Sequence, residues 1–479
     1  MSYYYSLPTT GAIKFASLLS DPSNAHAADL ARATNARGRV RSALKEARRS
    51  EGGNKDWSRC AAALQEYLPH LLAIIKCTEN EVLLVKVEPV FSWRPTLTAA
   101  RKTGRVPMHS FQYELCFVIL TYALALSNIS TSSVYVLGTY ERDPGVSELQ
   151  RKKGDEQINS AADTLCRAAG VLQYLSETLI PQLEASPGDL KDRPSEITRE
   201  VAGAVSKLCL ADAEKLAIRR LLSKSVAVAQ ATHTPGPPLP RSHPSPSLLA
   251  KLYLNVHQHY DSARALAKSV GNSATVRGTL MKNLMRDNSA STSSTDSSSD
   301  AIAQDLRTYL TDGRTFSSSL GYKWLGVDAG ENANKTGEAI SWLGLARTGL
   351  LELQSRAKVV MPLRKGKAER SKRKDRIVEE LEDIDAFMKS YKRTNDMVLF
   401  QPVPSAESLL SQIPVGRSVL AIKSYSLPGP AFAVRRQDEK GSSDPMLAAQ
   451  IAAMVVREEG DSDSDSSAID QSLHNSNYF

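Results

Sequence analysis

The sequence predicts an all-α (mostly helical) protein, and two patterns carry this prediction. Apolar residues recur at i, i+3, i+4 and i+7 through most of the 479 residues, which is the spacing of amphipathic helices. Only the stretch 82–93 is strand-like, with Val, Phe and Trp in an extended segment. Apolar residues make up 42% of the chain and charged residues 23%, as in ordinary globular proteins. This composition excludes collagen-like and wholly disordered chains.

Helical segments follow one another along the chain. The first has an apolar face that runs from Trp57 to Ile75, and Pro246 suits the first turn of a later helix. The nearly apolar run Leu115–Leu126 is shorter than the roughly 20 residues that span a bilayer, so we expect a buried helix there. The expected helices are 57–75, 111–127, 158–180, 196–222, 247–269, 301–320, 335–358 and 370–393.

Three stretches interrupt this pattern. Residues 233–246 contain six prolines and predict an extended loop. Residues 288–300 are almost entirely Ser, Thr, Asn and Asp, as in a disordered insert. We therefore expect a helical domain at 1–426 and a mostly disordered acidic tail at 427–479. Within the tail, the apolar run 446–456 predicts either a partner-binding helix or an extra helix docked on the domain.

Cysteine usage and the N-terminus indicate the compartment. The chain has five cysteines, an odd number, with no C-x-x-C pair, and most lie in apolar helical runs. Buried reduced thiols are expected, as in an intracellular protein. The first residues show no basic segment followed by an apolar one, so we expect no secretory signal. The expected location is cytoplasmic, either free or peripheral on a membrane.

Catalytic signatures are absent from the sequence. It contains no phosphate-binding glycine loop, no H-E-x-x-H and no G-x-S-x-G, so we expect no enzyme, no cofactor and no metal. His257 and His259 are two residues apart, and on a helix they point about 200° apart. We therefore interpret them as one surface and one partly buried histidine rather than as metal ligands.

The densest basic cluster lies at 356–376. It predicts either a solvated surface or a site that attracts an anionic membrane or an acidic partner. Nucleic acid is disfavoured because no aromatic residues are interleaved with the cluster. The candidate anion-facing residues are Arg364, Lys365, Lys367, Arg370, Lys372, Arg373 and Lys374.

The net charge of +8 divides unevenly along the chain. The tail 427–479 has four basic and nine acidic residues, a net −5, so residues 1–426 carry +13. A basic body and an acidic tail favour an acidic partner helix or an anionic endosomal or plasma-membrane surface. The tail would then screen the body until a partner displaces it.

Several stretches together resemble a known family. They are Tyr4–Gly11, Trp93–Leu97 followed by His109–Leu120, Lys335–Leu343, and Asn395–Val398. Their order and spacing over residues 1–425 are similar to the Bro-domain family, and within it to regulators of the fungal ambient-pH response. The resemblance implies a boomerang-shaped domain of tetratricopeptide-like helix pairs with a small β element near 82–93.

The resemblance also implies a function. Bro domains are scaffolds that bind the C-terminal amphipathic helix of an ESCRT-III subunit. The pH-response members are implied to bring this machinery to a signalling complex that includes a receptor, an arrestin-like protein and a calpain-like protease. There a zinc-finger transcription factor is activated by proteolysis at alkaline pH.

The family's binding groove is carried over from two motifs. Leu210–Glu214 matches an L-A-x-A-x motif, and Ser247–Leu252 resembles the start of the next helix. The expected groove residues are Ala217, Ile218, Arg220, Leu248 and Leu252. The alternative is that the apolar ones are ordinary core residues, since apolar helical stripes usually face inward.

Overall fold

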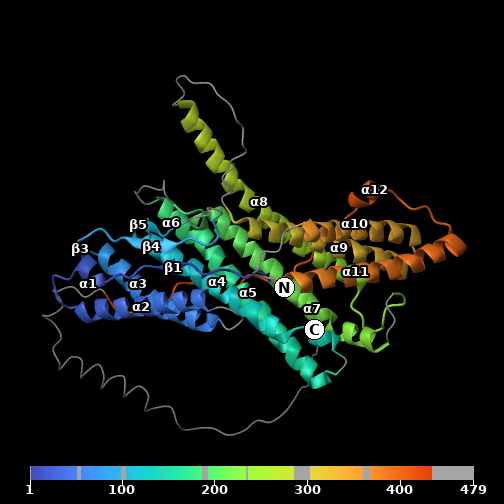
Figure 1. Cartoon of the computed structure of the whole chain (residues 1–479), viewed down its shortest axis with the longest axis horizontal. Coiled ribbons are helices and arrows are strands. Elements are labelled where there is room, and N and C mark those ends of the chain that lie inside the picture. The colour runs from blue at the N-terminus through green and yellow to red at the C-terminus, as the bar shows by residue number, and fades with distance from the viewer. Residues whose placement is uncertain are drawn as a thin grey trace, which may run out of the picture.

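The chain forms an elongated stack of helices, with two small β-sheets near one end (Figure 1). The computed structural model describes residues 2–50, 55–98, 104–143, 145–185, 193–232, 236–284, 302–359 and 367–433. Helices α1 to α12 are Phe15–Leu18, Ala27–Arg49, Trp57–Glu79, Phe111–Leu137, Glu148–Tyr174, Ile180–Ala185, Arg199–Thr232, Pro246–Leu284, Gln304–Glu331, Thr336–Val359, Lys367–Thr394 and Ala406–Leu410. The predicted mostly α class is confirmed.

The long helices pack on their neighbours in sequence. The packed pairs run α2–α3, α3–α4, α4–α5, α5–α7, α7–α8, α8–α9, α9–α10 and α10–α11. Such sequential pairing is the arrangement of tetratricopeptide-like solenoids. As a result, the N-terminal helices α1–α3 lie at one end and α10–α12 at the other (Figure 1).

Several helices extend beyond their expected ends, and α2 lies where the sequence pattern predicted no helix. α5 begins at Glu148 rather than at 158, because Ser147 and Gln150 form a reciprocal capping box. α8 begins at Pro246 as predicted but continues to Leu284. Among the described residues there are also four short helical turns: η1 (Tyr140–Arg142), η2 (Leu175–Leu179), η3 (Ser195–Ile197) and η4 (Asn395–Leu399), of which η2 and η4 are π-helical.

The expected β element is confirmed and is larger than the sequence indicates. Strand β4 (Phe91–Arg94) pairs antiparallel with β1 (Thr9–Thr10) and β5 (Val106–Met108). Strand β3 (Leu84–Val85) pairs with β2 (Leu19–Ser20). The side chains of Phe91 and Trp93 are fully buried, because alternate residues of a strand face the same side.

A single apolar core runs through the stack. All five cysteines are free and buried. Burial raises the pKa of every one of these thiols, to about 12 for Cys116, so they stay in the protonated form at neutral pH. α4 is long and apolar enough to cross a membrane by length and composition, but 89% of its most apolar window is buried within the fold. The expectation of a buried helix there is confirmed.

After α12 the chain crosses the stack as an extended segment, residues 411–433, which we call the strap. Its backbone donates hydrogen bonds from Arg417 to the Lys251 carbonyl (3.0 Å), from Lys423 to Cys166 (3.3 Å) and from Ala431 to Pro69 (2.9 Å). These acceptors lie on α8, α5 and α3. The strap thus spans most of the stack, and its contacts continue past residue 426 to Phe432, whose ring lies 5.3 Å from that of His26.

Several predicted segments lie wholly or partly outside the residues that the structure describes. The Ser/Thr-rich insert at 288–300, the apolar run 446–456 and the acidic tail beyond 433 lie outside the described residues. The proline-rich loop is described from residue 236, and it packs on the stack through His243, whose ring lies 4.9 Å from Trp324 on α9.

Candidate functional site

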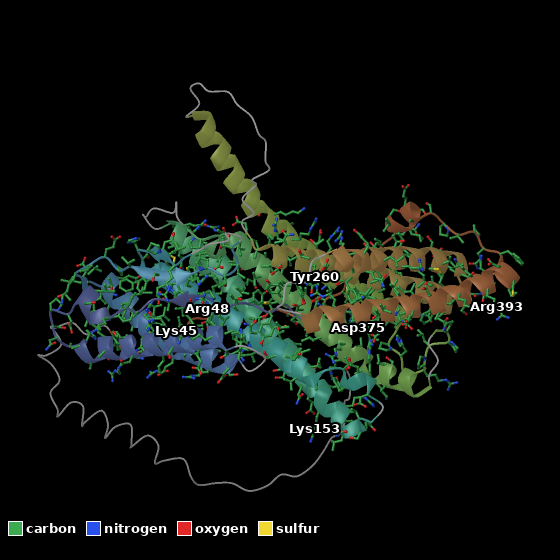
Figure 2. All side chains as sticks on the ribbon, viewed as in Figure 1. Lys45, Arg48, Lys153, Tyr260, Asp375 and Arg393 are labelled. Carbon is green, nitrogen blue, oxygen red and sulfur yellow. The ribbon has the colours of Figure 1, made fainter. Side chains whose placement is uncertain are left out.

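The Leu210–Glu214 motif lies in the middle of α7, and both of its carboxylates are buried. Buried carboxylates require hydrogen-bonding partners. Asp212 accepts hydrogen bonds from Tyr260 (2.5 Å), Tyr309 (2.8 Å) and the Lys215 ammonium (3.0 Å). These contacts tie α7 to α8 and α9. Tyr260 lies near the middle of the stack (Figure 2).

The Asp212 cluster also anchors the N-terminus. The backbone N–H of Tyr3 donates to the Asp212 carboxylate at 3.3 Å. Burial raises the pKa of Tyr260 and Tyr309 well above the ordinary value, with the neighbouring Asp212 adding to the effect. Both phenols therefore stay protonated and act as donors at any physiological pH. Asp212 is thus a structural anchor rather than a reactive group.

Glu214 makes the second set of buried contacts. The Asn255 amide on α8 donates to both of its oxygens at 2.8 Å, and the hydroxyl of Ser418 donates to Oε1 at 2.8 Å. Ser418 belongs to the strap, so one carboxylate joins α7, α8 and the strap. No sequence pattern marks Asn255 or Ser418, which lie 41 and 204 residues from Glu214.

The antiparallel packing of α7 and α8 brings the two groove motifs together. Glu214 contacts Asn255, and further along α7 the chain approaches the start of α8. Since numbering rises along α7 and falls along α8, residues 217–221 lie beside residues 248–252. The strap reaches the same place through the hydrogen bond from Arg417 to the carbonyl of Lys251.

The five predicted groove residues differ in exposure. Ile218 and Leu252 are only 1% and 3% exposed, so these two side chains belong to the core and have no free surface for a partner. This corrects their assignment as contact residues, because the apolar stripe that they form faces the interior of the α7/α8 pair. Ala217 and Leu248 are half-buried, and Arg220 is exposed.

The exposed apolar residue Leu221 on α7 was not among the predicted groove residues. Leu221 is 40% exposed and lies one turn beyond Ala217 on the same face of α7. Together with Ala217, Arg220 and Leu248 it forms what we call the α7/α8 surface. Its exposure is decided by neighbouring helices, and the sequence spacing alone does not show it.

Two of the seven candidate anion-facing residues have described side chains. Arg373 and Lys374 are both exposed, near the start of α11. Arg373 lies 3.5 Å from the Asp312 carboxylate and places its guanidinium 5.2 Å from the centre of the Tyr309 ring, so it is partly engaged within the fold. The side chains of the other five cluster candidates lie outside the described residues; they are Arg364, Lys365, Lys367, Arg370 and Lys372.

The paired histidines of α8 make separate contacts. The Nδ1 atom of His257 lies 3.1 Å from the Arg314 carbonyl, whereas Nε2 of His259 lies 3.7 Å from the Glu214 carboxylate. Both rings are half-buried, so the expected surface histidine is not fully exposed. Within the described parts of the chain, no group of three or more His, Cys, Asp or Glu side chains is placed to hold a metal ion.

Comparison with known proteins adds to this geometry. Residues 14–458 match the BRO1-like domain. The chain belongs to the BRO1-like domain family. It is 36% identical over 93% of its length to "pH-response regulator protein palC" of Cryptococcus neoformans var. neoformans serotype D (strain B-3501A), and covers 96% of that protein. It is 24% identical over 94% of its length to the palC protein of Yarrowia lipolytica (strain CLIB 122 / E 150), covering 99% of it.

Solved structures of BRO1-like domains share this fold. The complex "ALIX BRO1 CHMP4C" gives a TM-score of 0.55 at 14% identity, covering 90% of this chain and 97% of that one. The structure described as the basis for endosomal targeting by the Bro1 domain gives a TM-score of 0.52, covering 88% and 93%. At this identity the likeness shows a common architecture for the family and nothing about contact residues.

Proposed function

We propose that this chain is a non-enzymatic scaffold of the fungal ambient-pH signalling pathway. The observation that carries the proposal is the 36% identity to a palC pH-response regulator over nearly the whole chain. In this role the protein brings ESCRT-III to a complex of receptor, arrestin-like protein and calpain-like protease, where a zinc-finger transcription factor is cleaved at alkaline pH. It acts in the cytoplasm, peripherally at plasma-membrane or endosomal sites.

The proposed partner is the C-terminal amphipathic helix of an ESCRT-III subunit. Its proposed docking site is the α7/α8 surface. A BRO1 domain of the same fold has been solved with CHMP4C, which supports this class of partner. The chemistry is consistent, because Ala217, Leu221 and Leu248 offer apolar area while Arg220 offers a charge at the edge for an acidic side chain.

The buried carboxylates give this surface its rigidity. Asp212 and Glu214 fix α7 against α8, α9 and the strap through hydrogen bonds of 2.5–2.8 Å. Side chains on a fixed pair of helices lose little conformational freedom on binding, which favours affinity. In this proposal Asp212 and Glu214 hold the helices in place, while Ala217, Leu221 and Leu248 contact the partner.

Binding of ESCRT-III C-terminal peptides to the full chain tests the docking site. We expect Leu221→Asp and Leu248→Asp to weaken binding at least ten-fold, because each places a charge against the apolar face of the partner. Val136→Asp is the matched control, since Val136 is 86% exposed on α4. If both surface variants bind like the wild type, the site is wrong; if the wild type binds no such peptide, the partner is wrong.

The alternative function is binding to an anionic membrane or nucleic acid through residues 356–376. The exposed Lys374 at the start of α11 supports it. Such binding should fall steeply as salt rises and should be lost when the cluster's lysines are changed to Gln. Peptide binding at an apolar surface should change little with salt, so one titration separates the two functions.

A further inference from the structure

A group of apolar side chains is exposed where α11 ends. Met397, Val398 and Phe400 are 67%, 68% and 73% exposed, and Val403 follows at 52%. Monomeric proteins scatter single exposed apolar residues, whereas a contiguous group marks an interaction site. We call residues 389–403 the α11 tip. It lies at the end of the stack furthest from the N-terminal helices, as the position of Arg393 shows (Figure 2).

The backbone holds Phe400 in an uncommon conformation. The residue follows the π-helical turn η4 and has φ of 49°, in the left-handed region. Glycine or asparagine usually occupies such positions, and a bulky side chain there is strained. Its ring is nevertheless exposed, so burial of the ring within the described fold does not offset the strain. An unfavourable, exposed Phe is the kind of outlier from which a function can be inferred.

A polar network shows that this exposure is built into the fold. The buried Asn395 side chain accepts hydrogen bonds from the Gln401 N–H (3.0 Å) and the Thr336 hydroxyl (2.7 Å), and it donates to the Gln401 carbonyl (3.0 Å). The Gln401 amide in turn donates to the Asn334 carbonyl at 3.0 Å. These contacts clamp both sides of the turn onto α10. The apolar side chains are therefore presented by a fixed turn.

Basic residues flank the apolar group. Lys389, Lys392 and Arg393 are exposed on the last turns of α11, and within the described residues none of them forms an ion pair. Within the tip the one acidic residue is Asp396, which is exposed. Of the carboxylates near it in the chain or the fold, Glu407 is exposed, Glu331 accepts the Tyr391 hydroxyl (2.8 Å), and Glu338 pairs with Lys335 (3.0 Å).

The combination favours one occupant, an anionic lipid surface. Aromatic and aliphatic side chains enter the bilayer interface while neighbouring Lys and Arg side chains meet anionic headgroups. The apolar residues are exposed in the turn that follows α11, at one end of the stack, and this position suits insertion into a lipid surface. A peptide helix would instead need a groove to lie in.

We propose that the α11 tip is a membrane-inserting element that docks the end of the stack on anionic bilayers through Phe400, Met397 and Val398. This site is distinct from the basic cluster, which lies at the opposite end of α11, about 40 Å away for a helix of 28 residues. The proposal goes beyond ESCRT-III binding and does not depend on it.

A site-specific dye tests insertion directly. Because the five native cysteines are buried, Phe400→Cys can be labelled selectively with an environment-sensitive fluorophore. We expect the emission to rise and shift to the blue with phosphatidylcholine vesicles containing about one-third phosphatidylserine, and to be quenched by brominated lipid. The control is Val415→Cys, at an exposed position on the strap, whose label should not respond.

Vesicle sedimentation of the full chain gives the second readout. Phe400→Asn, which suits the left-handed backbone, should lower vesicle binding roughly ten-fold, as expected for loss of a buried aromatic side chain. The pair Lys392→Gln and Arg393→Gln should lower it on anionic but not on neutral vesicles. Lys45→Gln with Arg48→Gln on α2 (Figure 2) is the matched charge control and should bind normally.

Three outcomes overturn the proposal. The first is that the emission of the dye at position 400 changes with neither anionic nor neutral vesicles. The second is that Phe400→Asn sediments with vesicles as the wild type does. The third is that the emission changes with protein concentration in the absence of lipid, which would mean self-association. Peptide binding measured on the same preparations should be normal in every tip variant. If the wild type does not bind the ESCRT-III peptide, the proposed function fails, but the lipid measurements still decide the membrane proposal.

Discussion

Arg37 and Glu114 form a buried ion pair between α2 and α4, with Nε 2.8 Å from Oε1 and side-chain exposures of 2% and 0%. Both side chains of the pair also form hydrogen bonds with other groups. Arg37 also donates to the Thr10 hydroxyl and the Gly11 carbonyl, both at 2.7 Å, and Glu114 accepts from the Trp93 indole at 2.6 Å. The N-terminal strand, β4 and two helices thus meet at one charged centre.

Removing one member of this pair should strongly destabilise the fold. We expect Arg37→Ala to lower the free energy of unfolding by about 3–5 kcal/mol, because Glu114 would be left charged and buried without its main partner. Chemical denaturation followed by Trp fluorescence measures this. Arg39→Ala is the control, since Arg39 pairs with Glu66 at the surface, and it should cost less than about 1 kcal/mol. Equal losses in both variants would contradict the assignment.

Glu196 should make stability depend on pH. Its side chain is fully buried, it accepts the N–H groups of Thr96 and Leu97, and burial raises its pKa to about 7. Because the folded state binds the proton more tightly than the unfolded state, the free energy of unfolding falls as pH rises from about 4.5 to 7. The full drop is of order 3 kcal/mol.

The variant Glu196→Gln isolates this effect. It cannot ionise, so the part of the pH dependence between about 4.5 and 7 should disappear. Urea denaturation at pH 5 and pH 8 measures the difference for both proteins. A wild-type chain that gains stability over this range, or a variant with the same slope as the wild type, would show that Glu196 is ionised in the folded state at low pH.

The left-handed backbone at Phe400 predicts a stabilising substitution. Phe400→Asn should raise the free energy of unfolding by about 1 kcal/mol, because asparagine tolerates the φ of 49° better than a bulky residue does. Thermal unfolding detects this as a higher melting temperature. A lower melting temperature would mean that the Phe400 ring contributes packing that its exposure does not show.

The close contact between the strap and α5 depends on Gly170. A Cβ atom at this position would overlap the carbonyl oxygen of Lys423, so Gly170→Ala should displace the strap and expose it to proteolysis. Gly344→Ala on α10 is the matched control, since a Cβ there meets nothing within 4 Å. It should stabilise the chain by up to about 1 kcal/mol. Equal proteolysis of the two variants would argue against a tightly held strap.

Local patterns predicted most of the long helices and part of the β element, but not α2 (Ala27–Arg49). The apolar face of α3 was predicted from apolar spacing, and Trp57 and Leu64 on it are buried as expected. The partners of β4 were not predicted, because β1 lies about 80 residues away and is only two residues long. Short strands carry too little pattern to be recognised without their neighbours.

At the candidate site, the sequence did not predict which apolar side chains are exposed. Ile218 and Leu252 match the groove motifs in sequence, yet both are buried, whereas Leu221 matches no motif and is exposed. Apolar spacing predicts that a helix has an apolar face, but it does not predict whether another helix covers that face.

By itself the sequence determined the helical class, most of the long helices, the buried reduced cysteines and the resemblance to the Bro-domain family. These follow from periodicity, composition and local motifs, which act between near neighbours in the chain. Only the tertiary structure decided which apolar residues are exposed, that Glu214 joins Asn255 to Ser418, and that Phe400 is strained and exposed. Burial and long-range hydrogen bonds arise where distant segments pack, and no local pattern contains that information.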